Sequence, residues 1–432
     1  MKILLVVIDG VGDRPCKELG GKTPLEAATK PAIDSLAQKS RLGLMQVVRE
    51  NFAPETDSGV LSILGYDVMK YYTGRGPLEA YGVGLKVSEG TIAFRVNFAT
   101  GRDEKIIDRR VCRDLSDSEA ETLVRDINAK VKLTSVPVTF ELKSLGGYRC
   151  SLVIKKSGGM LSGNITNTDP AYRKEGYFSI PERSYTMVVQ ECIALDDSKE
   201  ALEAALLANE FSSQTSGFLK DHLINRKRMK EGKPPANLIL MRDAGDHLPL
   251  LPSIGRKFKA QFGFAAELYV ERGIALLTES EVVDIGKCSE DYAANYAHYA
   301  KAILKSMGSL DVMYIHLKGP DDAGHDGDPT KKKRIIEEID KFFFGNLLPH
   351  LDMKETLITV TSDHATPCEL KTHSSDPVPL LIAGWSIKPD KTATFDESTC
   401  ARGSLKTLHG IELMPLLMKL ASGHEIPETY LK

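Results

Sequence analysis

The chain has 432 residues, a length that corresponds to two or three domains of about 150 residues each. Apolar residues make up 42% of the chain and charged residues 27%, which is ordinary for a globular protein with a sizeable core. The net charge of -3 gives no overall basic field, so we expect no nucleic-acid or membrane partner, while a local basic pocket for a small anion stays compatible with it.

Cysteine usage and the N-terminus favour a reducing cytoplasm as the location. The seven cysteines are widely spaced and form no CxxC pair, so we predict neither a disulfide framework nor a cysteine zinc site. The apolar run at residues 3–8 is too short for the core of a signal peptide. The chain also lacks a run of about eighteen apolar residues, so we expect no membrane span.

The first half of the chain begins with a predicted buried parallel strand over residues 3–8, which stops at Asp9-Gly10. Thr23-Pro24 then predicts the start of a helix. Residues 91–98 and 136–142 alternate in polarity with few long helical patterns around them, which predicts an α+β insert over residues 70–182.

The second half alternates between apolar runs and helical patterns. We predict strands at residues 237–241, 264–270, 311–317, 356–360 and 377–383, and helices at residues 292–307, 332–348 and 410–420. This alternation predicts a mostly parallel sheet with helices on both faces. We therefore expect an α/β domain built from residues 1–69 and 183–432, into which the smaller α+β domain is inserted. The basic run at residues 331–334 is interpreted as a solvated helix face.

Acids and imidazoles follow several of the predicted strands. Ligands of open α/β sheets bind beyond the carboxyl ends of the strands, so these side chains are candidates for one shared site. Each segment alone is typical of a turn or a surface loop, but together they indicate a metal centre. The candidates are Asp9, Asp321, His325, Asp363, His364 and His373. Carboxylates with imidazoles suit Zn²⁺ or Mn²⁺ better than Ca²⁺, and six ligands suit two ions about 4 Å apart.

A short segment before residues 63–67 carries three hydroxyl groups, those of Thr56, Ser58 and Ser62. A hydroxyl at a helix N-terminus beside a metal has a lowered pKa and can attack phosphorus. The same residue types are also favoured as helix caps, and the two roles are compatible.

Several motifs follow one another as in a known family. They are Asp9-Gly10, TDSGVLSILGYD at 56–67, YTGRGP at 72–77, FRVNFAT at 94–100, DRR at 108–110, DDAGHDGD at 321–328, SDHATPC at 362–368 and HSSDPVPLL at 373–381. In this order the chain resembles the cofactor-independent (2,3-bisphosphoglycerate-independent) phosphoglycerate mutases of the archaeal type, a branch of the alkaline-phosphatase superfamily. The resemblance runs from residue 3 to about residue 420. It implies an alkaline-phosphatase-like fold whose insert caps the substrate.

The resemblance implies how the ligands divide between two divalent ions, for which Mn²⁺ is the first choice and Zn²⁺, Co²⁺ and Mg²⁺ are alternatives. One ion is held by Asp321, His325 and His373. The other is held by Asp9, Asp363, His364 and the oxygen of the nucleophile. No bisphosphoglycerate is required.

The nucleophile segment departs from the Gly-Ser-Asp triplet of that family. Counting back from Gly65 places Thr56 at the serine, with Asp57 as its neighbour. Ser58 is the rival, because Asp-Ser-Gly resembles the Asp-Ser-Ala of alkaline phosphatases. Glu55 replaces the glycine of the triplet and adds a negative charge beside the expected phosphate position.

The implied reaction is the interconversion of 3-phosphoglycerate and 2-phosphoglycerate through a phosphoenzyme, in glycolysis and gluconeogenesis. The alternatives are a phosphatase or another phosphotransferase of the superfamily, such as the homoserine-kinase-like group, and a metal-binding protein without catalysis. A small phosphorylated carboxylic acid needs cations around it, and arginine binds such oxyanions bidentately. By resemblance the substrate-binding residues are Asp108, Arg109, Arg110, Arg228 and Lys318, followed by Arg75 and Arg95.

Overall fold

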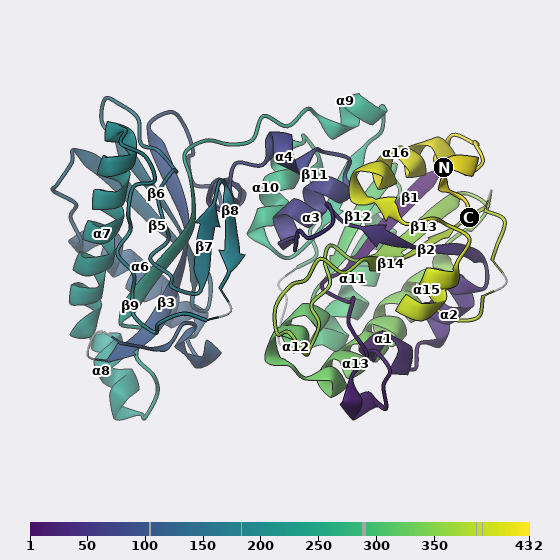
Figure 1. Ribbon diagram of the computed structural model, residues 1–432, viewed down its shortest axis with the longest axis horizontal. Coiled ribbons are helices and arrows are strands. Elements are labelled where there is room, and N and C mark those ends of the chain that lie inside the picture. Colours follow the sequence, from purple (N-terminus) through teal and green to yellow (C-terminus); the bar gives the residue numbers. More distant parts are fainter. Residues whose placement is uncertain (103–104, 183, 287–290, 386, 391) are drawn as a thin grey trace. The chain divides into compact units, whose positions relative to one another are not determined.

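The computed structural model describes residues 1–102, 105–182, 184–286, 291–385, 387–390 and 392–432 (Figure 1). The chain divides into two compact units. Unit 1 comprises Met1–Tyr71 and Leu251–Lys432, and unit 2 comprises Tyr72–Leu250. Among the described residues, no helix has the length and apolar character needed to cross a bilayer.

Unit 1 is built on an eight-stranded sheet with the order β11-β10-β12-β1-β13-β14-β2-β15. Only β14 runs antiparallel to its described neighbours, so the predicted mostly parallel α/β sheet is confirmed. The strands are β1 (Lys2–Ile8), β2 (Ser40–Gln46), β10 (Phe262–Ala265), β11 (Glu281–Val282), β12 (Val312–Leu317), β13 (Thr356–Thr361), β14 (Val378–Ala383) and β15 (Leu408–His409).

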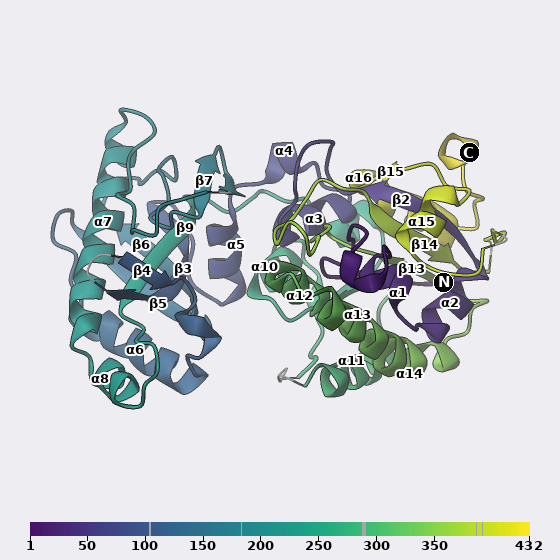
Figure 2. The same cartoon turned by 60° about the horizontal axis from the view of Figure 1, so that its bottom comes forward.

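Helices cover both faces of this sheet, which explains why its central strands are apolar throughout. Figures 1 and 2 show α3, α10 and α16 on one face and α2, α11 and α13 on the other. The α-helices of unit 1 are α1 (Pro24–Ala27), α2 (Pro31–Ala37), α3 (Thr56–Ile63), α4 (Val68–Tyr71), α9 (Ile254–Phe258), α10 (Tyr269–Leu277), α11 (Tyr292–Ser306), α12 (Pro320–Asp326), α13 (Pro329–Glu338), α14 (Gly345–Leu347), α15 (Glu397–Arg402) and α16 (Gly410–Ala421). A π-helical segment, Ile339–Phe344, joins α13 to α14.

The register of the central strands determines where the candidate site lies. Ile8 of β1 pairs with Leu317 of β12, and Val7 pairs with Thr361 of β13. Three parallel strands therefore end at nearly the same level, and the loops that follow them begin at one edge of the sheet. This is the edge at which open α/β sheets bind their ligands.

Unit 2 is an α+β fold built on a five-stranded antiparallel sheet, in which β4, β3, β6 and β5 are neighbours in that order and β9 also pairs with β3. The helices α6 and α7 pack on this sheet, as does α5 (Figure 2). The strands are β3 (Thr91–Arg102), β4 (Lys105–Asp108), β5 (Val138–Gly146), β6 (Arg149–Lys156), β7 (Tyr172–Glu175), β8 (Phe178–Pro181) and β9 (Leu238–Gly245); β7 and β8 form a separate hairpin. The helices are α5 (Arg75–Gly82), α6 (Asp117–Lys130), α7 (Lys199–Lys220) and α8 (Leu223–Lys230).

The expected boundary of the insert at residues 182 and 183 is wrong, because unit 2 extends to Leu250. The predicted strand at residues 237–241 exists as β9, but it does not join the parallel sheet. It pairs antiparallel with β3, so Val96 lies opposite Met241. The helix α7 packs against β9, which carries the whole segment between β8 and β9 into unit 2.

Candidate metal centre

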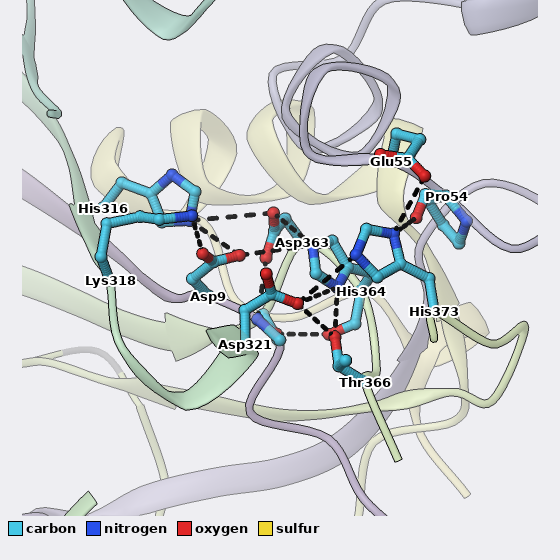
Figure 3. A network of polar contacts seen from close by, with 12 residues as sticks. Asp9, Pro54, Glu55, His316, Lys318, Asp321, Asp363, His364, Thr366 and His373 are labelled. Atoms are coloured by element: carbon cyan, nitrogen blue, oxygen red, sulfur yellow. Dashed lines mark hydrogen bonds and ion pairs between the residues drawn. The ribbon is translucent and has the colours of Figure 1, made fainter. Parts of the chain in front are cut away.

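All six predicted ligands lie in one cluster within unit 1, at the carboxyl edge of the large sheet. Figure 3 shows Asp9, Asp321, Asp363, His364 and His373 of this cluster. The side chains come from Asp9 after β1, Asp321 and His325 on α12, Asp363 and His364 after β13, and His373 before β14. Ligand atoms of Asp321, His325 and His373 lie within 4.8 Å of one another, and so do those of Asp9, Asp321 and His364. The cluster is therefore dense enough to hold metal ions.

The first group consists of Asp321 and two imidazoles that face it. Asp321 Oδ1 lies 3.5 Å from His325 Nε2 and 3.4 Å from His373 Nε2. On the side of each ring away from Asp321, the Nδ1–H group donates to a backbone carbonyl oxygen. His325 donates to Lys371 O at 3.0 Å, and His373 donates to Pro54 O at 2.9 Å. These bonds fix the tautomer, so both Nε2 lone pairs are directed at the position of an ion.

The second group is fully buried. His364 Nε2 lies 3.3 Å from Asp9 Oδ1 and 3.2 Å from Asp363 Oδ2. None of these three atoms has a hydrogen-bond partner among the described residues. The other oxygens of the two carboxylates are engaged, since Gly10 N donates to Asp363 Oδ1 at 3.3 Å and Lys318 Nζ contacts Asp9 Oδ2. Buried polar atoms without partners are rare in folded proteins, and a divalent cation fits these donors.

Thr366 connects the two groups. Its hydroxyl donates to Asp321 Oδ1 at 2.6 Å and accepts from His364 Nδ1 at 3.0 Å. His364 therefore also presents Nε2 to the second group. A side chain at Gly10 would collide with this bridge, because its Cβ would lie 2.6 Å from Thr366 Oγ1.

The ionisation of these groups favours a cation. Burial would raise the pKa of Asp321, but the nearby imidazoles of His325 and His373 hold it well below its usual range. Burial would likewise raise the pKa of Asp363, and His364 and His316 lower it. The carboxylates are therefore ionised at neutral pH and supply anionic donors.

His316 and Glu271 also belong to this cluster, and the sequence analysis missed both. His316 lies within the apolar strand β12, and its Nε2 is 3.7 Å from Asp9 Oδ1 and from Asp363 Oδ2. Glu271 lies on α10 and contacts His316 Nδ1. No local pattern marks either residue, because His316 lies in a strand whose residues are all buried and Glu271 lies on the buried side of α10.

The helix α3 starts beside the second group. Gly59 permits this approach, because a Cβ there would lie 2.3 Å from the carbonyl oxygen of Asp363. Thr56 is the first residue of the helix and is only 4% exposed. Thr56 therefore lies at the buried start of the helix that approaches Asp363.

Ser58 is occupied by a capping role. Its hydroxyl donates to the carbonyl oxygen of Glu55 at 2.9 Å and accepts from the amide of Glu55 at 3.0 Å. Asp57 Oδ1 accepts from the amide of Ser58 at 2.8 Å. The Glu55 carboxylate lies 3.5 Å from His373 Nδ1, on the side of the ring away from Asp321.

In unit 2, Arg75, Arg95 and Arg109 of the predicted substrate set form ion pairs with two buried acids. Glu79 Oε1 lies 2.9 Å from Arg75 Nε and 3.6 Å from Arg95 Nε. Asp169 Oδ2 lies 2.6 Å from Arg109 and 3.0 Å from Arg242, which the sequence analysis missed.

Several arginines of unit 2 act on the hydroxyl group of Tyr148. Burial would raise the pKa of the Tyr148 hydroxyl, but Arg149, Arg110 and Arg95 lower it below its ordinary value. Such a field favours a bound anion as it favours the tyrosinate.

Two members of the predicted substrate set have structural roles instead. Arg228 is fully buried and donates to Pro234 O at 2.8 Å and to Glu119 at 2.7 Å, so its prediction as a substrate contact is wrong. Asp108 Oδ1 accepts from the amides of Arg110 and Cys112, both at 2.7 Å, and thereby closes the turn after β4.

Comparison with known proteins decides the family. The model of the 2,3-bisphosphoglycerate-independent phosphoglycerate mutase family matches residues 37–225. The chain is 37% identical to the mutase of that name from Thermococcus kodakarensis, over 98% of both chains. It belongs to this family. The mutase of that name from Aeropyrum pernix is 38% identical and aligns over 98% of this chain and 100% of its own.

Two solved structures resemble the chain over nearly its whole length, and one of them carries the name of the family. The structure of PH0037 protein from Pyrococcus horikoshii is 31% identical with a TM-score of 0.76, over 98% of both chains. The cofactor-independent phosphoglycerate mutase from Thermoplasma acidophilum is 30% identical with a TM-score of 0.59, over 98% of this chain and 100% of its own. The resemblance to this family inferred from the motifs is therefore confirmed.

Proposed function

We propose that this chain interconverts 3-phosphoglycerate and 2-phosphoglycerate at a centre of two divalent ions, through a phosphoenzyme on Thr56. The observation that carries the proposal is the set of buried carboxylate and imidazole atoms that have no hydrogen-bond partner among the described residues, beside the approach of α3 to Asp363. The family supports the substrate, because its curated members are named phosphoglycerate mutases. We place the reaction in the cytoplasm, as a step of glycolysis and gluconeogenesis.

The ligand sets proposed for the ions are Asp321, His325 and His373 for one, and Asp9, Asp363, His364 and Thr56 for the other. When bound, such ions lower the pKa of a neighbouring hydroxyl and stabilise charge on a phosphoryl group. Mn²⁺ is our first choice, because mixed carboxylate and imidazole donors suit it.

The chain's own residues prepare the reaction around those ions. Thr56 Oγ1 attacks phosphorus, and the glycerate oxygen leaves and takes up a proton. Lys318, which contacts Asp9, supplies a positive charge near the phosphoryl oxygens. The second hydroxyl of the retained glycerate then takes the phosphoryl group from Thr56.

Unit 2 supplies the proposed cations for the carboxylate end of the substrate. Arg75, Arg95, Arg109 and Arg110 carry this role, and Arg242 joins them on the strength of its ion pair with Asp169. A mutase must keep water from the phosphoenzyme, and we propose that the inserted unit caps the substrate for this purpose.

A coupled assay tests the proposal. The purified chain receives Mn²⁺ and 3-phosphoglycerate without bisphosphoglycerate; enolase reports 2-phosphoglycerate, and free phosphate is followed in parallel. We expect an enolase signal with little free phosphate. Free phosphate without an enolase signal would identify a phosphatase instead. The absence of both signals would refute phosphoglycerate as the substrate.

A further inference from the structure

His316 lies at the second ion position, although it was not among the ligands expected from the motifs. We propose that His316 Nε2 is a direct ligand of the ion held by Asp9 and Asp363, and that Glu271 orients its ring. The inference rests on the proposed two-ion centre.

The distances around His316 Nε2 are those of atoms that share an ion. Nε2 lies 3.7 Å from both Asp9 Oδ1 and Asp363 Oδ2, which is too long for hydrogen bonds. An ion with bonds of about 2.1 Å to nitrogen and oxygen separates its donor atoms by about 3 to 3.7 Å, depending on the angle. The three side chains are fully buried, and none of the three atoms has a hydrogen-bond partner within the described ranges.

The far side of the ring is held by a carboxylate. Glu271 Oε1 accepts from His316 Nδ1 and, at 3.2 Å, from the hydroxyl of Tyr314. Glu271 Oε2 accepts from the amide of Leu268 at 3.3 Å, and the side chain is fully buried. A carboxylate that accepts Nδ1–H fixes the tautomer with a free lone pair on Nε2, which is the arrangement of metal-binding histidines.

His316 shares this arrangement with the other three imidazoles of the centre. In each of His325, His364 and His373, Nδ1 forms a hydrogen bond with an oxygen of another residue, and Nε2 faces a carboxylate of the cluster. A purely structural role for His316 would leave a buried Nε2 without a partner, which folded proteins avoid. Ligation satisfies Nε2 and both carboxylate oxygens at once.

The test measures metal binding rather than turnover. The full chain is freed of metal with a chelator and titrated with Mn²⁺ alone, and free Mn²⁺ is followed by electron paramagnetic resonance. The informative variant is His316→Asn, because an asparagine amide can still donate to Glu271 but lacks Nε2. We expect two Mn²⁺ ions in the wild type. In His316→Asn we expect one ion with unchanged affinity and the other weakened at least about 10-fold.

Glu271→Gln tests the orienting role, and we expect it to weaken the same ion by about 10- to 100-fold. The matched control is His222→Asn in unit 2, since His222 Nε2 also pairs with a carboxylate, Asp126, at 3.0 Å. Circular dichroism and thermal unfolding of the metal-free variants verify that each chain is folded. A variant that does not fold is replaced by His316→Gln.

The outcomes separate this inference from the proposed function. Wild-type affinity for both ions in folded His316→Asn would overturn the ligand role of His316 and leave the two-ion centre intact. Unchanged affinity in Glu271→Gln would overturn the orienting role. A wild-type chain that binds fewer than two ions would overturn the two-ion centre and this inference with it.

Discussion

Lys332 Nζ lies 2.8 Å from Asp13 Oδ2, and neither side chain has any exposed surface. The same ammonium group donates to the carbonyl oxygens of Gly12 and Thr366, at 3.2 and 2.9 Å. Lys332 therefore connects the loop after β1 to the loop that carries Thr366 through these hydrogen bonds. The interpretation of residues 331–334 as a solvated face is wrong for this lysine.

Removing this charge should destabilise unit 1 strongly. Lys332→Met leaves the Asp13 carboxylate buried without its partner, which costs about 3 to 5 kcal/mol in the free energy of unfolding. Lys333→Met is the matched control, because Lys333 is partly exposed and its ion pair is with Glu337, one turn away. This variant should change the free energy of unfolding by less than about 0.5 kcal/mol. Urea unfolding followed by the fluorescence of the single tryptophan, Trp385, measures both. Equal losses in the two variants would contradict this assignment.

Asp321 faces two imidazoles and accepts a hydrogen bond from Thr366. Removal of its carboxylate charge should therefore prevent an ion from binding at the first position. We expect Asp321→Asn to lower turnover of 3-phosphoglycerate by more than about 100-fold, since removal of one electrostatic contact can already cost this much. The far-ultraviolet circular dichroism should stay that of the wild type. Metal content by mass spectrometry should fall by one ion per chain. A variant that keeps both ions and full turnover would rule out the role of Asp321.

Thr56 and Ser58 should respond in opposite ways to loss of the hydroxyl. Thr56→Val should abolish turnover while Thr56→Ser retains it, because only the attacking oxygen is required. Ser58→Ala removes the capping bonds to Glu55 and should cost about 0.5 to 2 kcal/mol of stability while turnover persists. Initial rates in the enolase assay and urea unfolding of the three variants decide between the residues. Turnover by Thr56→Val with loss in Ser58→Ala would reverse the assignment.

Arg242 and Arg228 are both buried arginines of unit 2, but of these two Arg242 is the one that pairs with Asp169 beside Arg109. We expect Arg242→Met to raise KM for 3-phosphoglycerate at least about 10-fold, the cost of a lost charged hydrogen bond. Arg228→Met should leave KM unchanged. It should instead lower the free energy of unfolding by about 1 to 3 kcal/mol, because the carbonyl oxygen of Pro234 and the part-buried Glu119 lose their hydrogen bonds to the guanidinium. Steady-state kinetics and urea unfolding measure the two effects, and a raised KM in Arg228→Met would restore its predicted substrate contact.

Glu397 should make the stability of unit 1 depend on pH. Burial raises the pKa of this carboxyl to about 7, although Thr23 Oγ1 donates to it at 2.6 Å. A carboxyl group whose pKa is higher in the folded chain binds its proton more tightly there. It therefore stabilises the fold below pH 4.5, its pKa in the unfolded chain, and this contribution is lost as the pH rises through about 7. Glu397→Gln should therefore gain stability relative to the wild type between pH 5 and pH 8, by roughly 3 kcal/mol at most. A difference in unfolding free energy that does not grow with pH would contradict the raised pKa.

Local patterns were sufficient to predict that the six candidate ligands gather in one cluster. Asp9 and Asp363 directly follow apolar strands, and parallel strands of similar length must end at one edge of the sheet. Asp321 and His325 are four residues apart on one helix, which places them on the same face. Each of these relationships follows from a strand end or a helix spacing that is visible in the local sequence, so the sequence by itself predicted that these four side chains lie near one another.

The roles of the other charged residues were decided only by the tertiary structure. Lys332, Arg228 and Glu271 look like ordinary surface charges in the sequence, yet each is fully buried. Their partners lie far away in the chain, as Asp13 does from Lys332. The membership of β9 in unit 2 has the same origin, because its partner strand β3 lies more than a hundred residues upstream. A buried charge is stable only where folding brings a partner to it, and no local pattern records which distant segment that will be.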